Sequence, residues 1–342
     1  RYTSKDGRYR ALANYTFLSH EVFETGGIYF TPGTPRAELF DYEVEQVWLS
    51  GEAFNRDRRN AWHLYHDYQL DTNGRFRLFH VFDRLRQQWL YEDPEPAGRF
   101  PEDPLGREFY PNFLLSTSQT EQESVYHVYR NKAGLKGRLG QFRYGAFYRR
   151  QDFNFWSSIA SLHPVRREQF LGGWLIREQP GSFVKIEAEK MLQGQDFSLD
   201  ATIRTPYFVG RHRSMSHQPS LMAQGYVGNH FAWENNFRNP TVHRTHIMGT
   251  FSPWLLGIRP FLSNTLLQDF VYFGTTGEPE QAEESVLQFQ AGLELDFDWR
   301  KWHLESRTVY TSISGPEVIA VPGLTSNIRV FFGAPLFDKA LV

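Results

Sequence analysis

The feature that most constrains the fold is a strict two-residue alternation in residues 285–299, SVLQFQAGLELDFDW. Apolar side chains occupy every second position from Leu287 to Trp299, and polar or very small side chains occupy the positions between them. A period of two predicts a β-strand with one apolar and one polar face. At roughly 3.3 Å per residue this strand would run close to 50 Å, whereas strands of soluble domains are commonly about five or six residues long.

The same alternation recurs along the whole chain. It is clear in residues 8–20, 60–70, 141–151, 183–190 and 303–310, and less regular in residues 75–90, 122–136, 168–178, 197–206, 221–237, 242–251 and 257–273 and after residue 327. We find no segment with the 3.6-residue period of an amphipathic helix. The pattern predicts about fourteen strands in an all-β chain.

The connections between these strands alternate in length. Short turns are expected at Asn73-Gly74 and at residues 137–140, 179–182, 252–254 and 299–302. An Asn-Gly dipeptide favours the positive φ of a tight hairpin. Longer stretches cover residues 26–57, 92–121, 156–168, 274–284 and 314–326. The connections at 193–197 and 238–241 are shorter than this order requires, and 207–220 is longer than a tight turn.

Composition excludes several classes of protein. Mean hydropathy is −0.52, and no run of about 18 apolar residues predicts a transmembrane helix. The net charge is −2 with scattered basic residues, which argues against a nucleic-acid partner. The absence of cysteine excludes disulfides and thiol chemistry. Because the sequence starts at Arg1 without a signal-peptide pattern, we expect an internal piece of a longer chain.

An outer-membrane barrel explains these observations together. Hydrocarbon offers no hydrogen-bond partner, so a membrane-spanning sheet must close on itself. Its strands alternate apolar and polar side chains, with short periplasmic turns, long extracellular loops and aromatic girdles. Aromatic residues make up 16% of this chain, and they cluster at strand ends. A soluble β-sandwich or propeller explains neither this aromatic content nor the strand length. We therefore predict a transmembrane antiparallel up-and-down β-barrel as a single domain over residues 1–342.

The spacing of the candidate ligands and the lack of known motifs argue against a catalytic or metal site. His63 and His66 are three residues apart, as are His243 and His246, and such pairs point to opposite faces of a strand. His212 is expected in a turn. We find no nucleophile elbow, zinc-protease, phosphate-loop or dinucleotide motif. The sequence therefore predicts no catalytic residue, metal or cofactor.

Alternation also assigns side chains to the two faces of the wall. The most concentrated charge is the stripe Glu294, Asp296 and Asp298. It could select cations or be neutralised by arginines from a neighbouring strand, and the two interpretations can coexist because opposed charges across a pore create a transverse field. The predicted pore-lining residues are Arg8, Arg10, His63, Asp67, Arg143, Arg149, Lys185, Glu187, Glu189, Glu294, Asp296, Asp298, Glu305 and Arg307. The predicted lipid-facing or girdle residues are Tyr15, Phe17, Trp62, Tyr144, Tyr148, Trp156, Leu293, Leu295, Phe297 and Trp299.

Several stretches resemble the putative porin family of the Bacteroidetes outer membrane. They are GRYRALANYTF (7–17), YVGNHFAWENNF (226–237), QDFVYFG (268–274), VIAVPG (318–323) and LFDKALV (336–342). In the second, Gly228 replaces the family's usual serine, and the resemblance is carried by Asn229, His230, Phe231, Trp233, Asn235 or Asn236, and Phe237. The resemblance implies an outer-membrane barrel of a Gram-negative bacterium. Family members are longer at both ends, so further strands would close a barrel of about 14 to 18 strands.

These observations favour an outer-membrane porin for passive diffusion of small polar solutes. Loops 26–57 and 92–121 are candidates for constricting or plugging the lumen. One alternative is a plugged accessory barrel that docks a partner protein at its extracellular loops. An outer-membrane enzyme or a soluble carbohydrate-binding protein fits the residues less well. The expected partners are outer-membrane lipid, lipopolysaccharide and small polar solutes, with a homo-oligomer also open.

Overall fold

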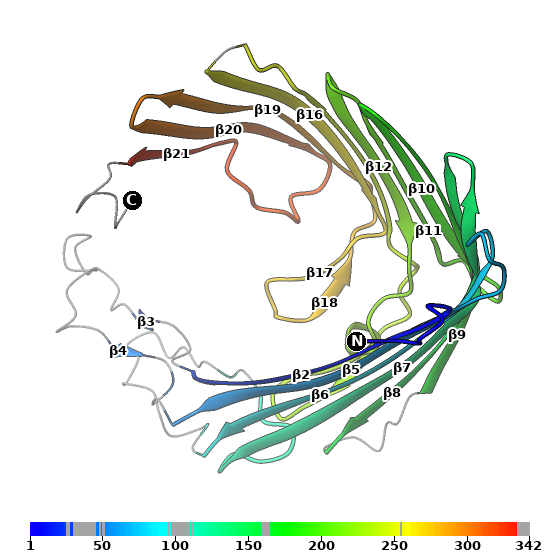
Figure 1. Cartoon of the computed structure of the whole chain (residues 1–342). Helices are drawn as coiled ribbons and strands as arrows, with labels where there is room; N and C mark the ends of the chain where they lie inside the picture. The colour runs from blue at the N-terminus through cyan, green and yellow to red at the C-terminus, as the bar shows by residue number, and fades with distance from the viewer. Residues whose placement is uncertain are drawn as a thin grey trace, which may run out of the picture.

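A computed structural model describes residues 1–24, 28–29, 46–47, 49, 52–94, 96, 110, 112–158, 165–253 and 255–333. Its main element is one curved antiparallel sheet of 15 strands, which follow one another in chain order around the curve (Figure 1). None of the helices in these residues is long and apolar enough to cross a membrane. The predicted LFDKALV stretch, Trp254, most of loop 26–57 and half of loop 92–121 lie outside the described residues.

The strands of the main sheet reach the lengths that the alternation predicts. The longest, β7, runs over Thr120–Leu139, and the opening motif forms β19, Val286–Trp299. The other main-sheet strands are β1 Tyr2–Thr3, β2 Tyr9–Phe23, β5 Phe54–Gln69, β6 Arg77–Asp93, β8 Phe142–Ser157, β9 Val165–Gln179, β10 Ser182–Met191, β11 Phe197–Arg204, β12 Phe208–Ser216, β15 Thr241–Gly249, β16 Leu256–Gln268, β20 Trp302–Ser314 and β21 Leu324–Phe332.

The two ends of the strands differ in how the chain connects them. At one end the strands join through short turns; for example, the hairpin between β5 and β6 turns at Gly74, whose φ is +67°. Asp71 holds that turn by accepting hydrogen bonds from the backbone N–H groups of Arg75 and Phe76 at 3.1 and 3.0 Å. At the other end the connections are generally longer, although the one between β10 and β11 is short. We call the two ends the short-turn rim and the long-connection rim.

Two predicted segments were wrong. Residues 221–237 are not a wall strand: they contain the short helix α1 (Leu221–Gln224) and the small hairpin β13 (Gly225–Val227) and β14 (Ala232–Glu234). Residues 207–220 are not one long turn, because β12 occupies most of them. In both cases the residue pattern is misleading. The strand β12 is rich in Arg, His and Ser and so does not look like a strand, whereas the folded connection contains apolar pairs that resemble the alternation of one. With both corrected, residues 217–240 form a single long connection at the long-connection rim.

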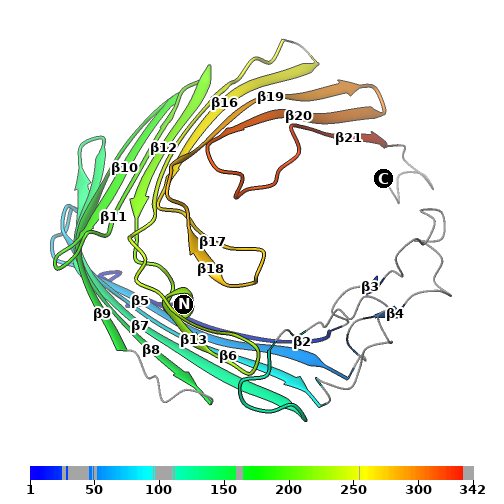
Figure 2. The same cartoon turned by 180° about the vertical axis from the view of Figure 1, so that it is seen from behind.

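Smaller strands lie outside the main sheet. They are β3 (Ile28–Tyr29) with β4 (Gln46–Val47), and β17 (Val271–Phe273) with β18 (Pro279–Gln281). Figures 1 and 2 show that β17 and β18 and the connection after β12 lie inside the curve of the sheet. The concave face of the wall is therefore the face that these segments approach.

Burial in this sheet is the reverse of that in a soluble protein. On the convex face large apolar side chains are exposed, including Phe17 (58%), Trp62 (49%) and Leu293 (38%). On the concave face charged and polar side chains are covered, including Asp67 (1%), Gln151 (6%) and Glu168 (5%). An apolar band facing outward and a polar interior are the arrangement of a barrel in a bilayer.

Candidate pore-lining surface

Contacts from the inner segments identify the concave face residue by residue. The Tyr226 hydroxyl donates to Gln122 Oε1 of β7 at 2.9 Å, and Arg166 of β9 donates to the carbonyl of Pro219 at 3.1 Å. Alternation then places every second residue of β7 and β9 on this face, including Arg130 and Lys132. The pairing register carries the assignment to the other strands.

Each strand residue that the sequence assigns to the pore lies on the concave face by this register, and Arg8 continues that face beyond the end of β2. Each residue assigned to lipid lies on the convex face. Their role in solute passage stays a prediction. The predicted pore-lining set does not include six further basic residues of the same concave face: Arg77, Arg130, Lys132, Lys136, Arg213 and Arg259. Extending the alternation through residues 122–136 would have found those of β7.

A buried carboxylate gathers three cations near the short-turn rim. Asp67 of β5 accepts hydrogen bonds from Arg10 Nε (3.0 Å) and Arg10 Nη2 (2.7 Å), from Arg77 (3.2 Å) and from Lys136 (2.9 Å). The Tyr65 hydroxyl also donates to it. Four strands, β2, β5, β6 and β7, are tied together by one side chain. The cluster leaves two positive charges in excess facing the interior.

A second cluster of charges lines a recess of about 680 Å³ that spans β6 to β12. Its cations are Arg130, Lys132, Arg149, Lys185 and Arg213, and its acids are Asp83, Glu187, Glu189 and Asp200. Most of these groups are paired. Arg149 makes a two-pronged contact with Glu189 at 2.7 and 3.1 Å, Lys185 contacts Glu187 at 2.7 Å, and Arg213 contacts Asp200 at 2.8 Å.

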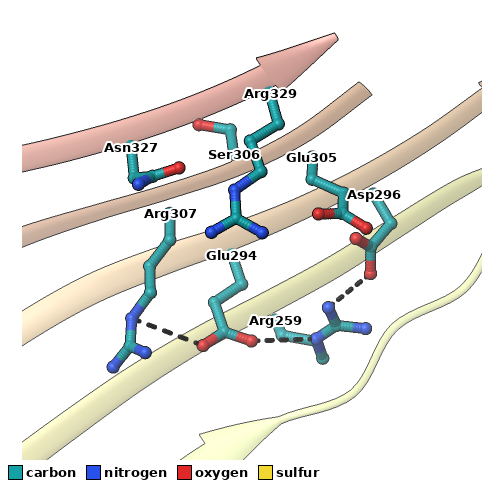
Figure 3. Close-up of a pocket in the computed structure, with 8 residues that line it drawn as sticks. All are labelled: Arg259, Glu294, Asp296, Glu305, Ser306, Arg307, Asn327 and Arg329. Atoms are coloured by element: carbon teal, nitrogen blue, oxygen red, sulfur yellow. Dashed lines mark hydrogen bonds and ion pairs between the residues drawn. The ribbon is translucent and has the colours of Figure 1, made fainter. Parts of the chain in front are cut away.

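The acidic stripe of β19 lies in a third recess of about 430 Å³, shown in Figure 3. Arg259 of β16 bridges Glu294 (3.2 Å) and Asp296, and Arg307 of β20 contacts Glu294 from the other side at 3.6 Å. Arginines from both neighbouring strands therefore pair with Glu294 and Asp296, as the second interpretation expects, and cation selection by the stripe stays a prediction. Asp298 pairs instead with His303 at 2.7 Å.

The histidines are placed by strand geometry. His63 and His66 point to opposite faces, as predicted: His63 contacts Asp83 on the concave face (2.7 Å), and His66 contacts His80 on the convex face (3.0 Å). His212 lies in β12, where it contacts Thr245, and not in the predicted turn. Among the described residues, Asp296, His303 and Glu305 bring donor atoms within 4.8 Å of one another. In this trio Arg259 pairs with Asp296, and His303 contacts Glu305 at 3.1 Å.

Aromatic rings on the concave face lie against glycines of adjacent strands. A Cβ at Gly145 would lie 2.5 Å from the ring of Trp174, and one at Gly172 would lie 2.6 Å from Phe147. Lys132 Nζ lies 3.5 Å from the centroid of the Phe147 ring. The glycines therefore leave room for the aromatic rings to lie flat against the sheet, and the ring of Phe147 makes a cation–π contact with Lys132. A sequence pattern of Gly opposite Phe or Trp in neighbouring strands could have indicated this.

The connection over residues 217–240, which we call the inner loop, fastens to the connection before β7. The Asn229 side chain accepts from the backbone N–H of Leu115 (3.0 Å) and Ser116 (2.9 Å), and donates to the Ser116 carbonyl and to Thr120 Oγ1, both at 2.7 Å. Asn229 is 3% exposed. The inner loop leaves the sheet at β12, so this contact joins wall segments that four strands separate.

His230 completes the contact beside Asn229. Its Nδ1 lies 3.0 Å from the Asn112 carbonyl and must carry the proton, so Nε2 accepts from the Thr120 hydroxyl at 2.9 Å. Tyr110 stacks on the imidazole at 3.6 Å between ring centroids. Burial lowers the pKa of His230 below its ordinary value, outweighing the Asn112 carbonyl and the Asp93 carboxylate, which act in the opposite direction. We call the contacts of Asn229 and His230 the clasp.

The hairpin of β17 and β18 packs on the inner loop. Arg238 pairs with Asp269 at 2.7 Å, and Gln281 accepts from the Arg238 N–H at 3.0 Å and donates to its carbonyl at 2.9 Å. The Trp233 and Phe273 rings meet edge to face at 6.4 Å. The two segments therefore form one inner assembly held against the wall. Most of the YVGNHFAWENNF motif builds this assembly and not a wall strand.

Comparison with known proteins places this fold. No curated protein sequence matches the chain. Among solved structures, the FrpB iron transporter from Neisseria meningitidis (F5-1 variant) matches with a TM-score of 0.58 at 10% identity, over 94% of this chain and 54% of that one. The siderophore receptors PirA and PiuA from Acinetobacter baumannii match with TM-scores of 0.57 and 0.56, at 9% and 10% identity, over 96% of this chain and 54% and 60% of theirs.

The chain thus spans little more than half the length of the structures it resembles, and at this identity the likeness establishes the fold alone. These neighbours are outer-membrane β-barrel receptors, which establishes the predicted all-β barrel fold. Together with the family match, they establish the bacterial outer membrane as its location. The family profile described as "Putative porin" matches residues 1–342, and the chain belongs to that family.

Proposed function

We propose that this protein is a porin through which small polar solutes diffuse passively across the outer membrane. The observation that carries the proposal is the concave face itself. It presents opposed cations and carboxylates in two recesses of about 430 and 680 Å³. A wall lined with paired charges is wettable and sets up a transverse field, which favours polar solutes over apolar ones. The proposal requires no chemical step and no cofactor.

Segments of the chain inside the barrel narrow the proposed pore. The inner loop and the β17–β18 hairpin lie inside the curve of the wall (Figures 1 and 2). We propose that this inner assembly sets the size limit for solutes, with the clasp as its anchor. The sequence had offered loops 26–57 and 92–121 for that role. Residues 112–121 of the second loop supply the groups to which Asn229 and His230 hydrogen-bond in the clasp.

Closure of the barrel needs more than the described sheet. Beyond Ala11, β2 has no paired strand on its outer edge in the described residues, and β21 is the other edge of the sheet. An open edge leaves backbone groups without partners in hydrocarbon. We propose that further strands of the full protein pair with both edges. By the usual orientation of such barrels, the short-turn rim faces the periplasm and the long-connection rim faces outward.

Swelling of proteoliposomes tests the proposal. Vesicles containing the full-length protein are placed in isotonic solutions of neutral sugars of increasing size, and the swelling rate is followed by light scattering. Passive diffusion predicts swelling that declines steeply with solute size and does not saturate with concentration. Swelling equal to that of protein-free vesicles, from protein shown to be folded and inserted, would refute the open pore.

A second function is favoured by the clasp. A buried, fully hydrogen-bonded contact across the interior also suits a plugged barrel that docks a partner protein at its outward loops. This alternative predicts silent vesicles together with one protein that co-purifies in a fixed ratio. The porin proposal predicts permeable vesicles whether or not such a protein is present.

A further inference from the structure

The convex face changes character along β6 in a way that an apolar lipid surface does not explain. Leu78 and Phe82 face outward near the short-turn rim, but the next outward positions are Arg84 and Arg86. Alternation fixes this orientation, because Asp83 contacts Arg130 on the concave face. The outward side of β6 therefore carries Leu78, His80 and Phe82 over its first half and the two arginines directly beyond them, before Gln88, Leu90 and Glu92 near the end of the strand.

A similar change occurs on two other strands of this region. On β5 it follows Trp62, whose ring lies 4.6 Å from that of Tyr15 on β2. On β8 it follows Tyr148, which is 40% exposed on the convex face. Exposed aromatic rings mark the membrane–water interface of such barrels. The basic residues therefore begin where the apolar band ends, on the side of the long-connection rim.

Four basic side chains gather at this boundary, and we call them the outer basic patch: Arg58, Arg84, Arg86 and His127. Their places follow from the register. Arg86 lies directly opposite His127 on β7 and Asn60 on β5, and Arg58 lies opposite Gln88, the next outward residue of β6. Cross-strand neighbours on one face have Cβ atoms roughly 5 Å apart.

The arginines of this patch have no acidic partner in the part of the chain that the structure describes. Arg86 donates only to the neutral Gln88 at 3.1 Å, and Arg84 lies 5.9 Å from the centroid of the Tyr129 ring. Arg84 Nε and His127 Nδ1 are shielded from solvent, and neither makes a hydrogen bond within the described residues.

Other arginines on the same convex face are neutralised. Arg56 pairs with Glu21 at 2.6 Å, and Arg150 and Arg167 share Asp152 at 3.0 and 2.9 Å. Among the described strands, the wall thus neutralises its outward arginines except at the outer basic patch and at Arg177, which lies at the short-turn rim. Adjacent like charges with buried, unsatisfied donors are costly unless a ligand compensates them. An anion that accepts several hydrogen bonds at the level of the lipid headgroups would compensate these charges.

We propose that the outer basic patch binds the phosphate groups of lipopolysaccharide in the outer leaflet. Guanidinium groups match phosphate oxygens with paired hydrogen bonds. The acyl chains of the same lipid would lie along the apolar band below, against Leu78 and Phe82. The assignment rests on the outer-membrane location and on charge complementarity, and it is independent of whether the barrel conducts solutes.

Binding of purified lipopolysaccharide to the folded protein in detergent tests the proposal. The variant combines Arg58→Gln, Arg84→Gln and Arg86→Gln. The control combines Arg75→Gln, Arg300→Gln and Lys301→Gln, which removes the same charge from the short-turn rim. Native mass spectrometry is expected to show at least tenfold weaker binding for the first variant and less than a twofold change for the control. Equal weakening of both, or of neither, would overturn the site.

The source of the anion is tested with the wild-type protein, so the test does not depend on how a variant folds. A ligand that binds the native state raises the denaturation midpoint. Lipopolysaccharide is expected to raise it, whereas the same lipid stripped of phosphate, or inorganic phosphate at the same concentration, is not. Equal stabilisation by the stripped lipid or by free phosphate would overturn the proposal. Loss of a co-purifying acidic protein from the triple variant, with lipid binding intact, would assign the patch to a protein partner instead.

Discussion

The clasp gives the sharpest prediction about the interior. Asn229→Ala removes four hydrogen bonds of 2.7 to 3.0 Å from a side chain that is 3% exposed. A typical net value is about 1 kcal/mol for each bond. Because water can replace some of them when the loop releases, we expect the closed clasp to lose about 3 kcal/mol. That corresponds to a roughly 100-fold fall in the ratio of fastened to released loop.

Single-channel recording measures this change. If the inner loop narrows the pore, N229A is expected to spend much more time in a larger conductance state than the wild type. The matched control is Asn235→Ala in the same loop. Asn235 donates one side-chain hydrogen bond, to the Ala223 carbonyl at 3.1 Å, and that bond stays within the inner loop. Identical conductance histograms for N229A and wild type would refute the view that the clasp holds a constriction.

The other predictions concern charge and pH. Exchanging Glu294 and Asp296 for Gln and Asn strips Arg259 of both partners, so reversal potentials should shift toward anion selectivity; an unchanged potential would show that the stripe does not face the ion path. Asp67→Asn leaves three cations facing a neutral group and should lower the free energy of unfolding in urea by about 3 kcal/mol, since those cations keep some solvent; a loss below about 1 kcal/mol would contradict this. Burial lowers the pKa of His230, so the released loop binds the proton more readily than the fastened one, and the clasp should weaken as pH falls below the ordinary histidine value; conductance that is the same at pH 7.5 and pH 5 would refute it.

The sequence predicted the wall well because alternation is a local property. A one-residue slip would send every side chain of a strand to the wrong face. The apolar residues Leu293 and Phe297 therefore determine where Glu294 and Asp296 point, with no knowledge of the neighbouring strands. For the same reason the opposite orientations of His63 and His66 followed from spacing alone.

The sequence predicted the interior poorly because its contacts are distant along the chain. Asn229 and Ser116 are 113 residues apart, and no local period predicts that they meet. The apolar pairs of residues 221–237 imitate a strand, but they pack on one another inside the inner loop, as Tyr226 does on Trp233 at 4.6 Å. The outer basic patch was not predicted, because the alternation in residues 75–90 is less regular and does not assign Arg84 and Arg86 to a face. Only the register with β5 and β7 shows that they lack acidic neighbours.

The most direct test of the account is the single-channel conductance of the full-length protein in a planar bilayer, after circular dichroism has confirmed a folded β protein. An open pore narrowed by the inner loop should give stable, ohmic steps whose size grows when Asn229 is replaced by Ala. Persistent silence from folded, inserted protein, in both wild type and N229A, would contradict the open pore and favour a plugged barrel that docks a partner.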